Sequence, residues 1–379
     1  MLHRIVSEFT NEQSLHDSFA QDLSELLDFS QKHYVSAAAT MPTKFCVAVS
    51  GGSDSLALLL LSRGWAQKNG GEIFCVTVDH QLRKESLEEA VFVQTLCESM
   101  RIEHKILAWN SQSDVVDSGK LENLAREARY RLILEFCAAE SVGIVLTGHT
   151  WNDQLETFAM RESHGSSKVG LAGISRIRSL ADNVKLLRPL LYFRRDCLKN
   201  FLRNRKMAWK DDPMNDDETF QRILWRKKIA SYSVEKTSEL SHEIMRLGKM
   251  RNAVEMKAVV FLRTFCEFLQ CGHAIIQRDQ FLMEERATRM EILRRVIWNV
   301  GGKKYATVIN ADLLAKILDG KINTLGRCLL KIKKHEILVF REIRLPCLSQ
   351  NHRIERGSVD LPSGSDGFVN KMNLFDVFL

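Results

Sequence analysis

The sequence lacks the features that define several common classes of protein. No stretch approaches the roughly 18 consecutive apolar residues that a membrane-spanning helix needs. Residues 1–29 carry acidic side chains throughout and contain no apolar core followed by a small-residue cleavage site, so they do not resemble a signal peptide. We therefore expect a protein that has no membrane partner and stays in the cytoplasm.

Paired cysteines are also absent. The nine cysteines are scattered along the chain, and no CxxC pair occurs among them. An odd number of cysteines without paired spacing argues against a disulfide framework and against a zinc ribbon. Cys46, Cys75 and Cys137 lie within apolar runs, so we interpret them as small core residues.

The length and the charge of the chain suggest what kind of protein it is. Its 379 residues exceed the roughly 100–200 residues of a typical domain, so we expect two or three domains. The net charge of +7 is mild, but basic side chains dominate residues 222–228 and residues 188–205, where Asp196 is the only acid. Clustered Arg and Lys are typical of nucleic-acid binding. A solvated helix face gives the same pattern, and charge alone leaves both interpretations open.

Short apolar runs alternate with helix-period segments in the first half of the chain. The expected strands are 45–50, 73–78, 104–109 and 144–149, and the segments that follow them have helical spacing of apolar residues. Strands that alternate with helices predict an α/β fold, in which helices cover both faces of a parallel sheet.

The remaining segments differ in composition and define the expected domains. Residues 1–40 are predicted to form a helical extension, 41–228 the α/β domain, and 229–300, which contain no proline, a helical domain. Strand-like runs return after Gly301-Gly302, with residues 333–335 at an expected hairpin turn. We therefore expect a small α+β domain over 301–379.

The strongest chemical signal lies where the first expected strand meets its helix, in the run Ser50, Gly51, Gly52, Ser53, Asp54 and Ser55. Glycines let the backbone turn tightly and approach a ligand. The free N–H groups of a helix N-terminus favour phosphate, and serine hydroxyls add donors. The run matches neither a Walker A loop nor a GxGxxG dinucleotide fingerprint. We interpret it as a phosphate-binding loop rather than as a simple helix cap.

Two further strands end in polar residues, at 78–80 and at 147–149. Ligands of open α/β sheets bind at the carboxyl ends of the strands. Asp153 and Glu156 follow the second of these turns three residues apart, so they share a helix face, although acids in a first turn also suit the helix dipole. We expect His149, Asp153 and Glu156 to converge near the loop, where paired carboxylates could hold an ammonium group.

The helical segment 121–140 contributes a basic face. Asn123, Arg126 and Tyr130 share one side of it. An arginine that faces a triphosphate would stabilise the charge of the α-phosphate during attack. The alternative is a solvated basic face, and we assign Arg126 to the site and Arg131 to the solvent.

Several of these motifs together resemble one enzyme family. SGGSDS, VDHQLR, NLAREARYR, TGHTWNDQLET and RPLL occur in the order and approximate spacing typical of tRNA(Ile)-lysidine synthetases, which belong to the N-type ATP pyrophosphatase or PP-loop superfamily. WKDDPMNDDETFQRILWRKK resembles the family's element after the catalytic domain. The resemblance covers about residues 44–228. It implies a PP-loop, adenine nucleotide alpha hydrolase-like fold for 41–228 and a tRNA-binding role for 301–379.

The resemblance also implies a two-step ligase reaction. ATP adenylates the C2 oxygen of the wobble cytidine in an isoleucine tRNA with a CAU anticodon, and pyrophosphate leaves. The amine of free lysine then attacks C2, and AMP leaves. By this resemblance residues 50–55 hold the ATP phosphates with Asp54 near magnesium, and Arg126 contacts the reacting phosphate. Asp153 and Glu156 recognise the lysine amine, and His149 lines the site.

Two positions depart from the family pattern. Asn152 stands where the family usually has an aspartate, which keeps an oxygen acceptor but loses a charge. Gln81 stands where glycine is usual, and we interpret it as a determinant of turn geometry rather than of chemistry.

Two other functions compete with this interpretation. Another PP-loop enzyme, such as a tRNA thiolase or an amide-forming synthetase, would share the loop, but the missing CxxC pair disfavours thiolation. Most amide-forming relatives need a glutaminase domain, and none is visible in the sequence. An RNA-binding module with an inactive nucleotide site is the second alternative, and the intact SGGSDS run with Asp153 and Glu156 disfavours it.

Overall fold

The structure is a computed structural model, and it describes residues 11–34, 44–81, 85–109, 118–166, 168–181, 183–210, 221–269, 271–302 and 308–342. The chain divides into two compact units, Met1–Arg251 and Asn252–Leu379. Parts of the expected N-terminal extension and of the expected C-terminal domain lie outside the described residues, namely 1–10, 35–40, 303–307 and 343–379. None of the helices in the described ranges combines the length and the apolar character that a membrane crossing requires.

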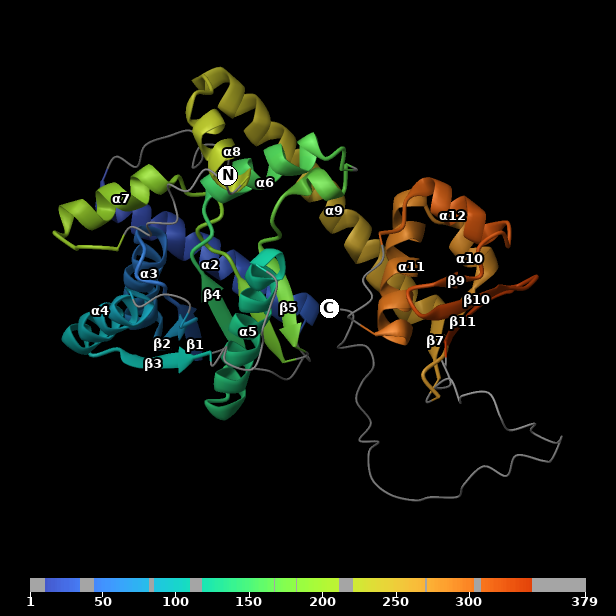
Figure 1. Ribbon diagram of the computed structural model, residues 1–379, viewed down its shortest axis with the longest axis horizontal. Coiled ribbons are helices and arrows are strands. Elements are labelled where there is room, and N and C mark those ends of the chain that lie inside the picture. Colours follow the sequence, from blue (N-terminus) through green and yellow to red (C-terminus); the bar gives the residue numbers. More distant parts are fainter. Residues whose placement is uncertain are drawn as a thin grey trace, which may run out of the picture. The chain divides into compact units, whose positions relative to one another are not determined.

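A six-stranded sheet organises the first unit (Figure 1). In spatial order its strands are β3 (Glu103–Ala108), β2 (Glu72–Asp79), β1 (Lys44–Ala48), β4 (Ile144–Thr147), β6 (Val184–Leu187) and β5 (Ile177–Ala181). Neighbouring strands run parallel except β5, which is antiparallel to β6. The parallel α/β sheet predicted from the sequence is confirmed, and the β5–β6 hairpin extends it beyond the four expected strands.

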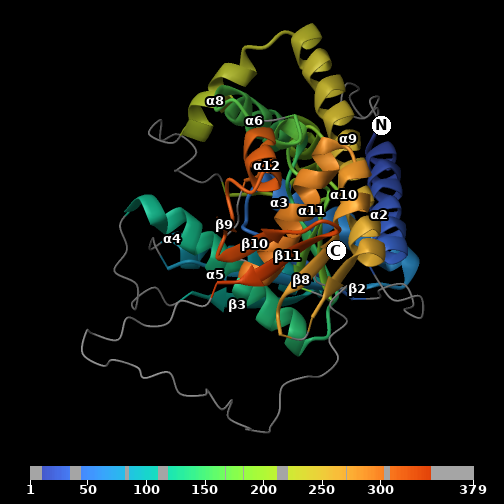
Figure 2. The same cartoon turned by 90° about the vertical axis from the view of Figure 1, so that its right-hand side faces the viewer.

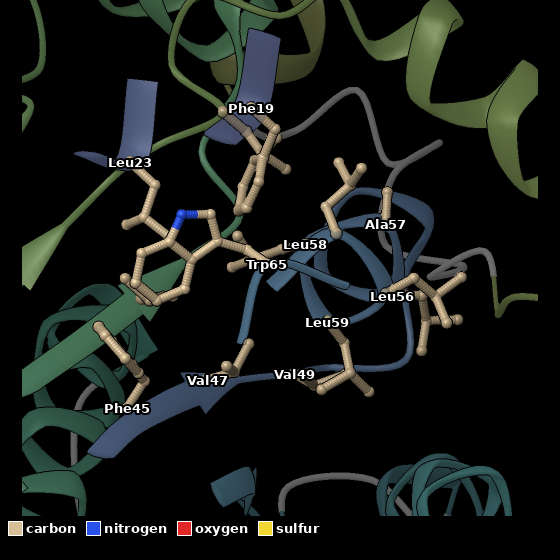
Figure 3. Packing of buried hydrophobic residues seen from close by; sticks show 14 of the residues in the cluster. Phe19, Leu23, Phe45, Val47, Val49, Leu56, Ala57, Leu58, Leu59 and Trp65 are labelled. Atoms are coloured by element: carbon tan, nitrogen blue, oxygen red, sulfur yellow. The ribbon is translucent and has the colours of Figure 1, made fainter. Parts of the chain in front are cut away.

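Helices cover both faces of this sheet. One buried core is shared by α2 (Glu12–Tyr34), α3 (Ser53–Asn69), α4 (Glu85–Met100) and α7 (Arg195–Asn204), whereas α5 (Ser118–Ala139) packs on the opposite face. Side chains of β1 alternate between the two cores, with Phe45 and Val47 in the first and Cys46 in the second. Figure 3 shows Trp65 of α3 in the first core, where its ring lies edge-on to Phe45 at 5.4 Å.

The strand order creates a switch point between β1 and β4. From β1 the sheet continues to β2 and β3 on one side, and to β4 and β6 on the other. Ala48, the last residue of β1, pairs with Thr147, the last residue of β4. The chain therefore leaves the sheet at two adjacent points on the same edge, which is where open α/β sheets bind their ligands.

The first unit also contains three helices beyond the sheet's carboxyl edge. These are α6 (Trp151–Ser163), α8 (Gln221–Ala230) and the first part of α9 (Val234–Phe265). Trp151 and Leu155 of α6 share a buried cluster with Ile244 and Leu247 of α9. A short 3-10 turn, Gly170–Ala172, packs beside them.

The second unit is built on an antiparallel sheet. Its strands in spatial order are β7 (Cys266–Phe268), β8 (Ala274–Gln277), β11 (Glu336–Arg341), β10 (Cys328–Ile332) and β9 (Thr324–Leu325). The last part of α9 packs into the core of this unit, together with the helices α10 (Arg278–Met283), α11 (Arg286–Gly301) and α12 (Ala311–Leu318) (Figure 2). Residues 333–335 form the turn between β10 and β11, as the sequence predicts.

Strands β7 and β8 lie in the segment 229–300, where the sequence predicts helices only. β8 pairs with β11, so residues on both sides of position 300 share one sheet and one core. The run that forms β8 is four residues long, and a short apolar run does not distinguish a strand from a buried helix segment by its periodicity.

Candidate active site

The run 50–55 forms a turn that opens a long helix. Gly51 has φ +88°, a conformation that favours glycine, and Gly52 caps α3 in an extended conformation. The Ser55 hydroxyl donates to the Gly52 carbonyl at 2.9 Å and accepts the Ser50 backbone N–H at 3.2 Å, which fixes the turn. Gly52 has no side chain to cap α3, so the first N–H groups of the helix remain available to a phosphate beyond its end.

Gly148 lets the end of β4 pack directly against this turn. A Cβ at position 148 would lie 3.0 Å from the Asp54 carbonyl oxygen and 3.1 Å from the Ser55 Cα. Any larger residue would push the two segments apart. Glycine at this position therefore brings the first turn of α6 next to Asp54, although the two segments are distant in the sequence.

Three carboxylates gather around the guanidinium of Arg195. Its Nε donates to Asp54 Oδ2 at 2.8 Å, and its two terminal nitrogens lie 3.5 Å from Asp153 Oδ1 and 3.9 Å from Glu156 Oε1. Arg226 of α8 adds a second cation, with its Nε 2.9 Å from Glu156 Oε1. We call these five residues the carboxylate group.

The carboxylate group is largely shielded from water. The side chain of Glu156 is 2% exposed and that of Asp153 is 11% exposed, and Arg195 is 19% exposed. Buried carboxylates are tolerated when cations and hydrogen bonds compensate for the lost hydration. The guanidinium groups of Arg195 and Arg226 face these three carboxylates and compensate for part of their lost hydration.

The ionisation of the group follows from burial and charge. Burial raises the pKa of the Asp54 carboxyl above its usual value, while Arg195 opposes that rise through its charge and its hydrogen bond. Burial alone would lower the pKa of Arg195, but the carboxylates of Asp54 and Asp153 outweigh it and raise that pKa. Arg195 therefore remains charged, and the ionised state of Asp54 depends on it.

The first turn of α6 is held by its own polar residues. Asp153 Oδ2 accepts the backbone N–H of Thr150 at 2.7 Å as part of a capping box, and it also accepts the Thr150 hydroxyl at 2.9 Å. Asn152 Oδ1 accepts the backbone N–H of Arg195 at 3.0 Å and so fixes the start of α7. The amide at position 152 thus orients Arg195 through the backbone.

His149 lies half-buried at the end of β4, where its Nδ1 is 3.1 Å from the Thr147 hydroxyl. At the end of β2, Gln81 has φ +52° and donates its backbone N–H to Asp79 Oδ1 at 2.9 Å. The left-handed backbone explains why glycine suits this position.

Arg126 belongs to a different cluster of side chains from the carboxylates around Arg195. Its guanidinium is exposed on α5 and stacks over the Tyr130 ring at 5.2 Å, with Arg178 of β5 over the same ring at 5.5 Å. The side chain of Asn123 lies outside the described residues.

Sequence reasoning missed the roles of Arg195 and Arg226. Both belong to the basic stretches, in which we expected contacts with nucleic acid or a solvated face. Arg195 is instead bound to Asp54, whereas its neighbour Arg194 is 45% exposed. One signal could have revealed them, because three carboxylates that are buried together need cationic partners.

Comparison with known proteins gives consistent matches. Residues 21–232 match the family model of the PP-loop domain. A tRNA(Ile)-lysidine synthase from Ruegeria pomeroyi is 33% identical over 314 residues, which cover 80% of this chain and 73% of that protein. The corresponding enzyme from Orientia tsutsugamushi is 29% identical over 313 residues, 79% of this chain and 70% of its own.

Two further matches are more limited: one covers a smaller part of both proteins, and the other is a structure with low sequence identity. A tRNA(Ile)-lysidine synthase from Hyphomonas neptunium is 42% identical over 194 residues, 50% of this chain and 51% of its own. Among solved structures, the U34-tRNA thiolase NcsA from Methanococcus maripaludis aligns with 61% of this chain and 80% of its own. Its TM-score of 0.49 and 15% identity are too low to bear on activity.

Proposed function

The chain belongs to the PP-loop family and, within it, to the tRNA(Ile)-lysidine synthases, and we propose that it converts the wobble cytidine of a CAU-anticodon isoleucine tRNA to lysidine. ATP-dependent modification of tRNA follows from this membership and confirms the ligase interpretation of the motifs. The proposal adds free lysine as the amine donor, the CAU anticodon as the determinant of the substrate, and the cytoplasm as the place of reaction. The observation that carries it is the carboxylate group beside the phosphate-binding turn.

The turn at residues 50–55 would hold the pyrophosphate part of ATP. Its support is the open N-terminus of α3 together with the hydroxyls of Ser50 and Ser53, which lie at the switch point of the sheet. Phosphate bound there places the α-phosphate outward from the turn, toward an incoming base. The C2 oxygen of cytidine would attack that phosphorus, and pyrophosphate would leave.

Magnesium would bind with the nucleotide at Asp54. Among the described residues no three His, Cys, Asp or Glu side chains are grouped to hold a metal by themselves. Magnesium commonly takes only one or two protein carboxylates and completes its shell with phosphates and water. The Asp54 carboxylate at the phosphate turn fits this pattern. The ion would neutralise the charge of the leaving pyrophosphate.

Asp153 and Glu156 would bind the amine of lysine. Both lie on the first turns of α6, buried and already paired with guanidinium groups. A primary ammonium offers the same charge and hydrogen-bond donors as a guanidinium, in a smaller volume. When lysine binds, its ammonium would replace Arg226 on Glu156, and the carboxylates would take up the proton that the amine loses before it attacks C2.

Arg126 would contact the α-phosphate, and His149 would line the space between the turn and α6. The exposed guanidinium of Arg126 supports this role, because it can approach a phosphate without breaking an ion pair to an acid. We also propose that the C-terminal part of the chain, from residue 301, helps to bind tRNA. Support comes from Lys331, Lys333 and Lys334 on the β10–β11 hairpin, of which Lys333 has a side chain 49% exposed.

Arg195 would act as a positioning residue that keeps Asp54 ionised. Replacing Arg195 by glutamine removes the charge that opposes the effect of burial, so the pKa of Asp54 should rise further above its usual value. Ionised Asp54 is the active form, so the acidic limb of the pH–rate profile should move to higher pH by the same amount. The measurement is kcat/KM for ATP in tRNA adenylation across pH.

Two variants separate this role from simple packing. Arg195→Lys keeps the charge and should leave the acidic limb close to that of the unmodified enzyme. Arg194→Gln changes the exposed neighbour and should leave the profile unchanged. An Arg195→Gln variant that is slower at every pH, with the limb in place, would show that Arg195 only supports the fold.

Labelled lysine tests the proposed function as a whole. The protein, incubated with ATP, magnesium, labelled lysine and a CAU-anticodon isoleucine tRNA, should transfer the label to the tRNA. If ATP is turned over in a tRNA-dependent way but no lysine is transferred, the proposed amine donor is wrong. That outcome would favour another PP-loop enzyme of the thiolase or amide-forming type.

A further inference from the structure

We propose that Arg126, Arg178 and Arg188, gathered around Tyr130, form a second site that binds a phosphate of the RNA substrate, next to the α-phosphate of ATP that Arg126 also contacts. We call these four residues the arginine cluster. The proposal rests on the proposed function, because it assigns the phosphate to the tRNA that the enzyme modifies. It is independent of the carboxylate group, with which the cluster shares no residue.

The sheet brings the arginines to one place. Arg178 of β5 pairs with Leu186 of β6, and Arg188 lies two residues beyond Leu186. Side chains two residues apart on a strand share a face, so Arg178 and Arg188 lie on the side of the sheet that carries Leu186. That side is covered by α5, and Tyr130 of α5 packs against the same core as Leu186.

Tyr130 is the centre of the cluster. The guanidinium of Arg126 lies 5.2 Å from the ring centroid and that of Arg178 lies 5.5 Å from it. Both arginines are exposed, whereas Tyr130 is half-buried beneath them. Two cations on one ring repel each other unless an anion lies between them, and cation–π attraction offsets only part of that repulsion.

Arg188 gives the cluster a buried cation. The residue is 3% exposed, one terminal nitrogen donates to the Ser175 carbonyl at 2.7 Å, and its Nε has no hydrogen-bond partner among the described residues. Burial lowers the pKa of Arg188 to about 10, and the neighbouring Arg178 and Arg126 act in the same direction. A buried guanidinium that meets carbonyl oxygen and phenol rather than a carboxylate is suited to an anion that arrives with a ligand.

The position of the cluster separates it from the pyrophosphate turn. Leu187 pairs with Leu146, so Arg188 lies level with Thr147, at the carboxyl edge of the sheet. β6 is two strands away from β1, which corresponds to about 10 Å. The terminal phosphates of ATP at residues 50–55 therefore do not fill the cluster.

An RNA phosphodiester fits this separation. The wobble base must reach the α-phosphate of ATP. The backbone phosphate of the wobble nucleotide therefore lies about the length of one nucleotide away from the turn at residues 50–55. Arginine binds phosphate through two parallel N–H donors, and a cluster of three can bind it from several sides. We infer that the cluster fixes the backbone beside the wobble base and so holds C2 in line with the α-phosphate.

The salt dependence of RNA binding tests the site without any chemical step. In the full-length protein, Arg178→Gln should weaken binding of an unmodified CAU-anticodon isoleucine tRNA transcript by about fivefold at physiological salt. The slope of log affinity against log salt concentration should flatten by about 0.7–0.9, the share of one phosphate contact. Arg178→Lys should retain the slope, because it retains the charge.

Arg131→Gln is the matched control, since Arg131 is an exposed arginine on the same helix as Arg126. It should change neither the affinity nor the slope. A slope in Arg178→Gln equal to that in Arg131→Gln would overturn the proposal. Weaker binding of a non-hydrolysable ATP analogue or of lysine, with an unchanged slope for RNA, would also overturn it, because the anion would then come from another substrate. A protein that binds the transcript through Arg178 but transfers no lysine would refute the proposed function and leave the phosphate site standing.

Discussion

Replacing Asp54 by asparagine should reduce tRNA-dependent release of pyrophosphate by about a hundredfold to a thousandfold, the loss typical of one electrostatic contact to a reacting group. Asparagine keeps the shape of the side chain but removes the charge that Arg195 now contacts at 2.8 Å. The turn would lose the carboxylate that we propose for magnesium. Adenylation precedes the attack by lysine, so transfer of lysine should fall by the same factor.

The measurement is single-turnover release of pyrophosphate with saturating tRNA, followed by transfer of lysine in the same reaction. Asp196→Asn is the matched control, because Asp196 follows Arg195 in the sequence and its side chain is 76% exposed. It should retain full activity. Pyrophosphate release at a normal rate by Asp54→Asn would exclude Asp54 from the adenylation step.

Replacing Glu156 by glutamine should separate the two chemical steps. The Glu156 carboxylate is buried and contacts Arg226 at 2.9 Å, on the side of the site that we assign to the lysine amine. Glutamine loses the charge that an ammonium group needs but leaves the turn at residues 50–55 intact. We expect adenylation within about tenfold of normal and lysine transfer reduced by more than about a hundredfold, so adenylated tRNA should accumulate.

Quenched reactions with ATP labelled in the α-phosphate measure the adenylated tRNA, and labelled lysine measures the second step. Glu162→Gln, an exposed position on the same helix, is the control and should leave both steps unchanged. Equal losses of adenylation in Asp54→Asn and Glu156→Gln would contradict the division of roles between the turn and α6.

Much of the first unit could be predicted because its signals are local. The strand runs at 45–50 and 144–149 begin with continuous apolar residues, and the turn at 50–55 combines glycines and serines at a strand–helix junction. These features depend on neighbours within a few residues. The same holds for the capping box of Thr150 and Asp153, which shares its residues with the site.

The cationic half of the site could not be predicted, because it depends on contacts between distant residues. Arg195 and Asp54 are 141 residues apart in the sequence, and Arg226 and Glu156 are 70 residues apart. A run of arginines looks the same whether each side chain enters a site or points to solvent. Only the packing of α7 and α8 near α3 and α6 distinguishes Arg195 and Arg226 from exposed neighbours such as Arg194.

The short strands escaped prediction for a related reason. β6 and β8 have four residues each. A pattern of apolar and polar residues that short does not distinguish a strand from one turn of a buried helix. β6 nevertheless places Arg188 at the carboxyl edge, and β5 places Arg178 opposite Leu186. The arginine cluster therefore becomes visible only when the sheet order is known.

Nucleoside analysis of the tRNA product tests the central claim most directly. The protein is incubated with ATP, magnesium, free lysine and a CAU-anticodon isoleucine tRNA, and the tRNA is then digested and its nucleosides identified by mass. We predict that lysidine replaces cytidine at the wobble position alone, and that a tRNA with a different first anticodon base remains unmodified. An unmodified wobble cytidine after ATP has been consumed, or a product that carries sulfur or an amine other than lysine, would contradict the account.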